Sequence, residues 1–123
     1  MPPLPGALLP LKDLVFRILV TLATGERHGW GMVQALGDSG PRVLPGHLYR
    51  TLDSMLDLGL IDERDEPLET AEEPSRAAAR GAAPTRFFRL TPFGRKVAEA
   101  ETARLEGLIA RSRAAGLAKA KGR

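Results

Sequence analysis

The chain has 123 residues, of which 43% are hydrophobic, and carries a net charge of +3 at pH 7. It contains no cysteine and only two histidines, which excludes disulfides and thiolate metal sites and argues against structural zinc. The length fits one domain, expected in the reducing cytoplasm, and a core of this size often gains stability by dimerising. No apolar run approaches the ~20 residues that cross a bilayer, and the proline-rich N-terminus is a poor secretory signal.

The N-terminal half of the chain alternates apolar periodicity with breaks. Residues 1–10 hold four prolines and no periodicity, which predicts an extended arm. Helical spacing of apolar residues then predicts the clearest helix of the chain over Leu11–Leu22. Residues 26–29 are expected to form a turn into a short second helix, Gly29–Leu36, and residues 37–41 to break the chain again.

A third helix, starting at Pro45, is bounded at both ends. Pro45 suits the first helical turn, and Gly59 suits the position just past the helix, where positive φ is needed. The apolar residues of this segment recur at helical spacing on one face: Leu48, Leu52, Met55 and Leu56. The remaining faces carry polar side chains: His47, Arg50, Thr51 and Ser54. One side of the helix can be buried while the other contacts a partner.

Two strands are expected after this helix, joined by a long connection. The β-prone segments are Leu60–Arg64 and Thr85–Leu90, and they predict an antiparallel hairpin. The connection, residues 65–84, is acidic in its first half and basic in its second, and we interpret it as an elongated wing.

The C-terminal region predicts one long helix and a short tail. Thr91 is a suitable N-cap before Pro92, and the helix is expected over Pro92–Ala115. Its apolar seam is too extended for one small domain to cover, which predicts a partner helix. Residues 92–123 carry 8 Lys+Arg against 3 Asp+Glu. The basic stretch from Arg111 to Arg123, which includes the tail at residues 116–123, is expected to be a solvated helix end, with contact to DNA phosphates as the alternative.

This order of elements defines the fold class. It is mainly α with a small β-hairpin: a winged helix-turn-helix domain over residues 11–91, followed by a C-terminal dimerisation helix over residues 92–115. No internal repeat is present.

Four local strings stand along this framework in a fixed order. They are Ile18-Leu19-Val20-Thr21-Leu22; His28-Gly29-Trp30; Pro45-Gly46-His47-Leu48-Tyr49-Arg50-Thr51-Leu52 with Gly59-Leu60-Ile61; and Phe88-Arg89-Leu90-Thr91-Pro92-Phe93-Gly94. Together they span roughly residues 11–109, and in this combination the chain resembles the PadR family of bacterial transcription regulators, in particular its short members with a single terminal helix. The resemblance implies a homodimeric repressor that binds a palindromic operator in double-stranded DNA and is released by a small-molecule effector or another signal.

The resemblance places DNA contacts on the third helix and in the wing. The candidates are His47, Tyr49, Arg50, Thr51, Ser54, Arg76, Arg80 and Arg86. Arg50 is the best candidate for base contact, because a guanidinium matches the O6 and N7 atoms of guanine, with phosphate contact or a solvated surface position as the alternatives. Tyr49 is expected at a phosphate, with a position at the edge of the core as the alternative, and Arg86 is expected to hold phosphates with one other wing arginine.

The dimer interface is expected along the first and last helices. Its candidate residues are Leu11, Leu14, Ile18, Phe93, Val97, Ala100, Leu105, Leu108 and Ile109. Trp30 is expected in the core, with an effector pocket between subunits as the alternative, because an indole can stack on planar ligands. His28 is expected to be structural.

The chain also departs from the family pattern. Leu44 stands where a Ser or Thr commonly caps the third helix, Trp30 replaces a tyrosine, and the wing is longer. No catalytic constellation, cofactor motif or metal-ligand cluster is recognisable, so no enzymatic activity and no cofactor are expected. Two other functions stay open: a winged helix that holds a protein partner, and a ligand-sensing dimer with its pocket near Trp30.

Overall fold

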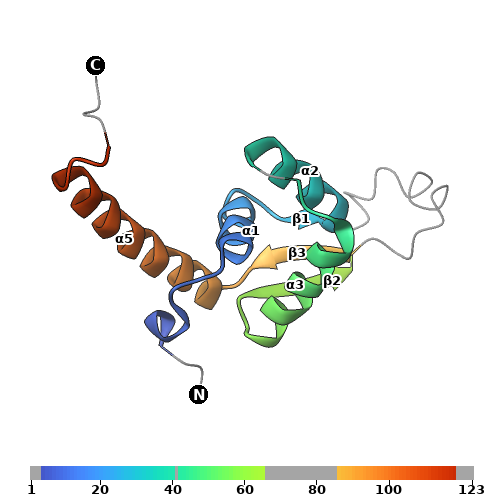
Figure 1. Cartoon of the computed structure of the whole chain (residues 1–123). Helices are drawn as coiled ribbons and strands as arrows, with labels where there is room; N and C mark the ends of the chain where they lie inside the picture. The colour runs from blue at the N-terminus through green and yellow to red at the C-terminus, as the bar shows by residue number, and fades with distance from the viewer. Residues whose placement is uncertain (1–3, 41, 66–85, 119–123) are drawn as a thin grey trace.

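The computed structural model describes residues 4–40, 42–65 and 86–118, and within these ranges the side chains of Trp30, Ser39 and Asp65 are not described. The elements follow in the order η1 (Pro5–Leu8), α1 (Asp13–Ala23), β1 (Arg27–His28), α2 (Gly29–Ser39), α3 (Pro45–Asp57), β2 (Ile61–Asp65), β3 (Arg86–Leu90) and α5 (Pro92–Ala114). Helices α1, α2 and α3 and the sheet form one body, and α5 extends away from it beside α1 (Figure 1). Among the described residues, no helix is long and apolar enough to span a membrane.

The core lies where α1, α2 and α3 meet the sheet and the first turns of α5. Its fully buried members are apolar: Ile18, Leu19, Leu22, Met32, Leu36, Leu48, Leu52, Met55, Leu60, Ile61, Phe88 and Val97. The predicted apolar faces of the first and third helices both supply this core, as periodicity arguments require. The first helix begins at Asp13 rather than Leu11, and Leu11 packs against the core ahead of it.

The sheet has three strands, in the order β1-β3-β2, all antiparallel. The expected hairpin is present, with Ile61 opposite Leu90 and Arg64 opposite Phe87. The expected turn at residues 26–29 is corrected: Arg27 and His28 form a third strand that pairs with Phe88 and Phe87. Two residues are too few to show the alternation that predicts a strand, so only the pairing identifies β1.

The second helix is also longer than expected, since it continues through Gly37 and Asp38 to Ser39. The chain breaks at Gly40 instead, where an added β-carbon would lie 2.0 Å from Arg17 Nη2. The same Nη2 donates a hydrogen bond to the Leu36 carbonyl at 3.0 Å. Arg17 of α1 therefore fixes the end of α2. Local turn propensity cannot predict this contact between two helices.

The segment before α1 is not an extended arm throughout. Residues Pro5–Leu8 form a 3-10 helix, and Leu8 and Leu9 pack partly buried against the core. The backbone N–H of Leu11 donates to Glu101 Oε2 on α5 at 3.1 Å. The proline-rich composition predicted an extended segment, whereas in the structure this segment forms a 3-10 helix that packs against α5.

Glu101 is the buried charged residue of the described part of the chain, with 2% of its surface exposed. Arg104, one turn further on α5, donates to both of its carboxylate oxygens at 2.6 and 3.0 Å. These hydrogen bonds, together with that from Leu11, lower the pKa of Glu101 against the opposing effect of burial. The carboxylate is thus charged and joins the N-terminal segment to α5.

Several expectations fall on residues that the structure does not describe. They include residues 66–85, which contain most of the expected wing with Arg76 and Arg80, and residues 119–123 of the basic tail. For Trp30, the backbone lies in α2.

Candidate nucleic-acid interface

Helix α3 divides into a buried and an exposed face. Leu48, Leu52 and Met55 are completely buried, which confirms the predicted amphipathic pattern. The opposite face carries His47, Arg50 and Ser54, all exposed, and Thr51, which is half-buried. The Thr51 hydroxyl donates to the His47 carbonyl at 2.9 Å, one turn back along the helix. The polar face is therefore available to a partner from outside the molecule.

A groove of about 440 Å³ lies between this face and the start of α1. Its walls are Lys12, Leu14, Val15, His47, Arg50, Thr51 and Ser54. Within the described ranges, neither Lys12 nor Arg50 takes part in an ion pair. Two positive charges that no described carboxylate pairs with therefore lie on one groove.

Sequence analysis missed Lys12 as a member of this site. It stands at the N-cap of α1, far along the chain from the polar residues of α3, and no periodicity links the two. Only the packing of α1 against α3 brings them together.

The N-terminus of α3 is open. Leu44 at the N-cap position makes no side-chain cap hydrogen bond and is 72% exposed. A β-carbon added to Gly46 in the first turn would lie 3.6 Å from Arg50 Nη1, so the guanidinium lies beside this helix end. Uncapped N–H groups and the helix dipole make such an end favourable to anions.

Tyr49 lies at the edge of the core. It packs partly buried against the core, and its hydroxyl lies 2.0 Å from where a β-carbon on Gly29 would be placed. Burial raises the pKa of its hydroxyl, opposed by the nearby positive charge of Arg86. A position at the edge of the core was the alternative expected for Tyr49 beside a phosphate contact.

Arg86 occupies a position that the sequence did not predict. Its Nε and Nη2 donate to Glu63 at 2.7 and 2.8 Å, and Nη2 also donates to Asp53 on α3 at 2.7 Å. The guanidinium carbon lies 5.5 Å from the ring centroid of Tyr49 and 5.2 Å from that of Phe88. The hydrogen bond from Arg86 lowers the pKa of Glu63, and both carboxylates raise the pKa of Arg86. Arg86 therefore joins both wing strands to α3, with its charge balanced within the molecule.

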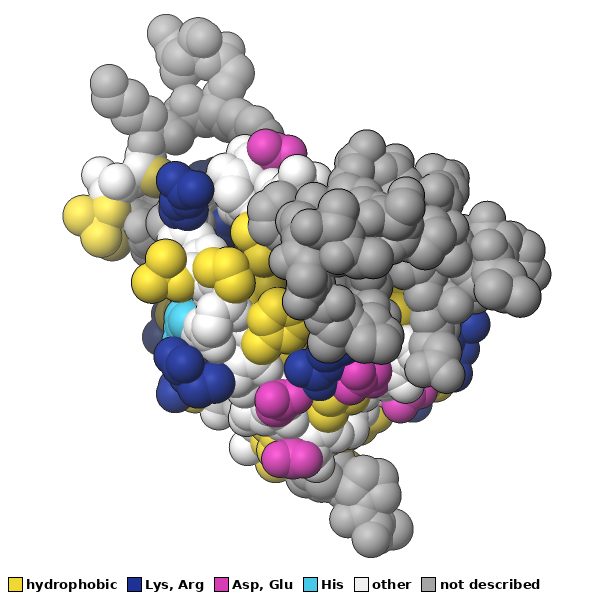
Figure 2. Space-filling model, turned by 90° about the vertical axis from the view of Figure 1, so that its right-hand side faces the viewer, with side chains coloured by type: hydrophobic (Ala, Val, Ile, Leu, Met, Phe, Trp, Pro, Cys, Tyr) yellow, Lys and Arg dark blue, Asp and Glu magenta, His cyan; other side chains and the backbone are white. Residues whose placement is uncertain are grey.

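The other arginines of the wing strands are also paired. Arg64 forms an ion pair with Glu26 and lies over the Phe87 ring, and Arg89 lies 3.7 Å from Asp62. Figure 2 shows the result on one face: basic and acidic side chains lie next to each other, and the basic ones form separate groups rather than one continuous patch. The described arginines of these strands are therefore all paired with carboxylates, whereas Lys12 and Arg50 in the groove beside α3 belong to no ion pair of the described residues.

The expected dimer residues fall into three groups. Ile18 and Val97 are completely buried within the single chain, so they serve its own core. Leu11, Leu14 and Phe93 are partly buried and pack on that core, and Ala100 and Leu105 are half-buried. Leu108 and Ile109 remain 46% and 48% exposed near the end of α5. Among the expected dimer residues, those most exposed in the single chain therefore lie near the C-terminal end of α5.

A close contact explains Gly94, and a positive φ explains Gly59. Gly94, in the first turn of α5, has Leu60 O 2.0 Å from its ideal β-carbon position, so any side chain would push the helix off the α3–β2 turn. The Thr91 side chain fixes the start of α5. Its hydroxyl oxygen accepts a hydrogen bond from the Gly94 N–H at 2.9 Å, and its hydroxyl group donates one to the Gly59 carbonyl oxygen at 2.7 Å. The predicted N-cap at Thr91 and positive φ at Gly59, +78°, are both confirmed.

No protein-family model matches the chain, and no curated protein matches it significantly. Solved structures do resemble it. A PadR family transcriptional regulator from Eggerthella lenta gives a TM-score of 0.60 at 17% identity, over 83% of this chain and 82% of that one. RosR from H. salinarum gives 0.55 at 21% identity, over 88% and 98% of the two chains. A zinc-responsive MarR family member from Lactococcus lactis, ZitR, gives 0.59 at 17% identity, over 92% and 66%.

These similarities define the class of fold. The chain is a winged helix-turn-helix with a small three-stranded sheet and a long C-terminal helix, as the sequence predicted. The fold is PadR-like, and MarR family members share it. Among the described residues, no group of three or more His, Asp or Glu side chains is arranged to hold a metal ion.

Proposed function

We propose that the protein is a sequence-specific DNA-binding transcription regulator, a repressor that acts as a homodimer on a palindromic operator. The observation that carries this proposal is the groove on the exposed face of α3, where Arg50 and Lys12, which no described carboxylate pairs with, lie beside a helix end whose N-cap residue provides no side-chain cap. A helix with one face in the core and the other polar can enter the major groove of DNA, as in helix-turn-helix proteins. The similar solved structures, which include transcription regulators, support the same function.

In this proposal the polar residues of the exposed face of α3 contact bases and the sugar-phosphate backbone. Arg50 contacts a guanine through two hydrogen bonds, and His47, Thr51 and Ser54 contact neighbouring bases or sugar-phosphate groups. Lys12 holds a phosphate from the opposite wall of the groove. Phosphate contacts by Tyr49, Arg76, Arg80 and Arg86 remain part of the proposal, although for Arg86 a phosphate must compete with Glu63 and Asp53.

A selection from random duplexes on the purified protein, at near-physiological salt, tests this function. We expect a palindromic motif whose half-sites lie one or two helical turns apart. Arg50→Ala should then reduce affinity for the selected site by roughly 5- to 150-fold and relax preference at one base position, since a bidentate pair contributes about 1–3 kcal/mol. Arg111→Ala, an exposed arginine on α5, is the matched control and should leave both unchanged.

A protein-interaction module is the competing function, favoured by the balanced pairs of charge on the wing strands. It predicts that the selection yields no motif and that binding to DNA lacks a steep salt dependence. A selected motif, or an affinity for DNA that falls steeply with salt, supports the DNA-binding proposal instead.

An effector that releases the protein from DNA belongs to the same proposal, with Trp30 as the proposed contact. The chain has a single tryptophan, so ligand binding near it can be followed directly by fluorescence quenching. Quenching together with loss of operator binding supports sensing by this residue.

A further inference from the structure

Leu44, the residue just before α3, has an exposed side chain at the start of the helix. Its side chain is 72% exposed, and it has no atom that could accept a hydrogen bond from the N–H groups of the first turn. Its backbone is held in place, because the Leu44 carbonyl oxygen accepts a hydrogen bond from the Leu48 N–H at 3.0 Å. The side chain of Leu44 therefore contributes neither to the buried core nor to the capping of α3.

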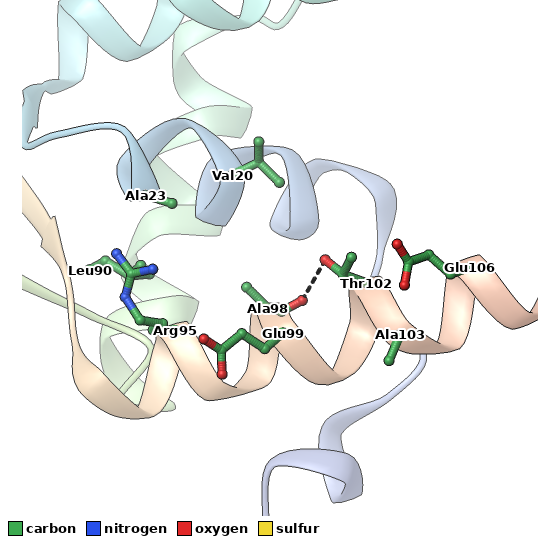
Figure 3. Close-up of a pocket in the computed structure, with 9 residues that line it drawn as sticks. All are labelled: Val20, Ala23, Leu90, Arg95, Ala98, Glu99, Thr102, Ala103 and Glu106. Atoms are coloured by element: carbon green, nitrogen blue, oxygen red, sulfur yellow. Dashed lines mark hydrogen bonds between the residues drawn. The ribbon is translucent and has the colours of Figure 1, made fainter.

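Single exposed leucines are common on protein surfaces, so the surroundings of Leu44 decide its role. Val20, which is 48% exposed, lines a groove of about 320 Å³ between α1 and α5, together with Ala98 of α5 (Figure 3). These two helices carry the expected dimer interface. Figure 1 shows α5 on the far side of α1 from the start of α3. Leu44 therefore does not belong to the groove between α1 and α5.

Leu44 lies instead at the end of α3 where the candidate DNA contacts begin. Pro45, Gly46 and His47, which follow it, are all exposed, and His47 and Arg50 both line the groove beside α3. Arg50 Nη1 lies 3.6 Å from the position of a β-carbon on Gly46, so the guanidinium is turned back towards the first turn of the helix. The exposed leucine side chain and the guanidinium thus lie at the same end of α3.

We propose that Leu44 determines base preference: its methyl groups contact the C5-methyl group of a thymine in the major groove, beside the base that Arg50 contacts. This inference rests on the proposed DNA-binding function and names one base of the operator. In helix-turn-helix proteins the N-terminal residues of the recognition helix contact base edges, and Leu44 lies at this end of α3.

Thymine is the base that an exposed leucine can distinguish. It alone presents a methyl group in the major groove, whereas the other three bases present only hydrogen-bond donors and acceptors. Leucine has no donor or acceptor, so its contact with those bases would cover polar atoms that lose their hydrogen bonds to water. Arg50 has the complementary preference, because its guanidinium matches the acceptors of guanine. The two side chains together predict a half-site in which a guanine and a thymine lie close to each other.

Removal of a single methyl group from the DNA tests this contact. Deoxyuridine replaces each thymidine of the selected operator in turn, in both half-sites, because it differs from thymidine only in lacking the C5-methyl group. The full-length wild-type protein should lose affinity about threefold to fivefold per half-site at one of these positions, as expected for one buried methyl group. Leu44→Ala should bind the unmodified operator more weakly and should not respond to that replacement, because the leucine methyl groups are missing.

A second variant separates base reading from a structural role. Leu44→Ser places a hydroxyl group at the N-cap of α3, where it can accept from an N–H group of the first turn, so L44S should raise the melting temperature by roughly 2–6 °C. It should nevertheless lose the response to deoxyuridine, as L44A does. A leucine that only stabilised α3 would give the reverse: a lower melting temperature and an unchanged response.

Two further substitutions are controls for this experiment. Leu44→Met keeps an unbranched apolar side chain at the same position and should retain the response to deoxyuridine. Leu58→Ser makes the same change as L44S at an exposed leucine, 46% accessible, at the other end of α3. It should also retain the response, whatever its effect on stability.

The outcomes separate the role of Leu44 from the function of α3. A motif without a thymine, an operator that is insensitive to deoxyuridine at every position, or an equal response of wild type and L44A overturns the thymine contact. If Arg50→Ala still relaxes the selected motif in that case, DNA reading by α3 stands without Leu44. If the random duplexes yield no motif at all, the DNA-binding function is rejected, and the thymine contact is rejected with it.

Discussion

The hydroxyl of Tyr49 fills the space beside Gly29: a β-carbon at Gly29 would lie 2.0 Å from the hydroxyl oxygen and 2.5 Å from the ring carbon that bears it. The two residues belong to different strings of the sequence, one opening α2 and the other in α3. Their contact sets how closely the first turn of α2 approaches the helix that we propose reads DNA.

Gly29→Ala should therefore destabilise the fold by about 1–3 kcal/mol, because a rigid, half-buried ring must move to admit the new methyl group. Urea denaturation measures the loss. The double variant G29A/Y49L should recover part of it, since leucine removes the atoms that clash; strictly additive effects of the two substitutions would contradict the contact.

Gly94→Ala should be more disruptive than Gly29→Ala, because the obstructing atom is the backbone carbonyl oxygen of Leu60 rather than a side chain. We expect a loss of about 3 kcal/mol or more, seen as a lower melting temperature. Gly107→Ala is the matched control on the same helix, with open space at its β-carbon position. It should stabilise α5 by up to about 1 kcal/mol.

Glu101→Gln should destabilise the fold at neutral pH by about 1–3 kcal/mol, because a buried charged acceptor loses its charge towards Arg104 and Leu11 N. The pKa of Glu101 is lowered by folding, so its contribution is complete above the unfolded value of about 4.3 and is lost as pH falls through the folded value.

Urea titrations between neutral pH and the acid range check this sign. The free energy of unfolding of wild type should fall more steeply below about pH 4.3 than that of E101Q. Asp57→Asn, at an exposed carboxylate outside every ion pair of the described residues, should retain the wild-type slope. Equal acid slopes for wild type and E101Q would show that Glu101 carries no such contribution.

Arg86→Ala should loosen the connection between the wing strands and α3. It leaves Glu63 and Asp53 without their shared donor, and we expect a loss of about 1–2 kcal/mol, moderated by partial solvent exposure. Hydrogen exchange should quicken at the amides of β2 and β3. Arg89→Ala, which breaks only the longer contact to Asp62, serves as the comparison and should change little.

Lys12→Ala should weaken binding to the selected operator and to unrelated DNA by a similar factor. A residue that holds a phosphate contributes to the counterions released on binding, so the slope of log K against log salt should become shallower by about 1. Lys96→Ala, an exposed lysine on α5, is the control. A change in base preference for K12A with an unchanged slope would contradict the phosphate role.

Features that depend on a few neighbouring residues could be predicted from the amino-acid sequence. Helical spacing gave the buried face of α3, Thr91 and Pro92 set the start of α5, and Gly59 had to take positive φ. These follow from side-chain periodicity and backbone sterics, which act within one or two turns. The order of these elements was enough to predict the winged-helix class.

Tertiary structure alone decided how distant residues combine. It paired the two residues of β1 with β3, brought Lys12 to the groove of α3, and buried Glu101 against Leu11 N. It also paired the positive charge of Arg86, which was expected to hold phosphates, with the carboxylate of Asp53 from another element. The free energy of such contacts depends on distances that only the packing of the whole chain sets, so no local pattern can report them.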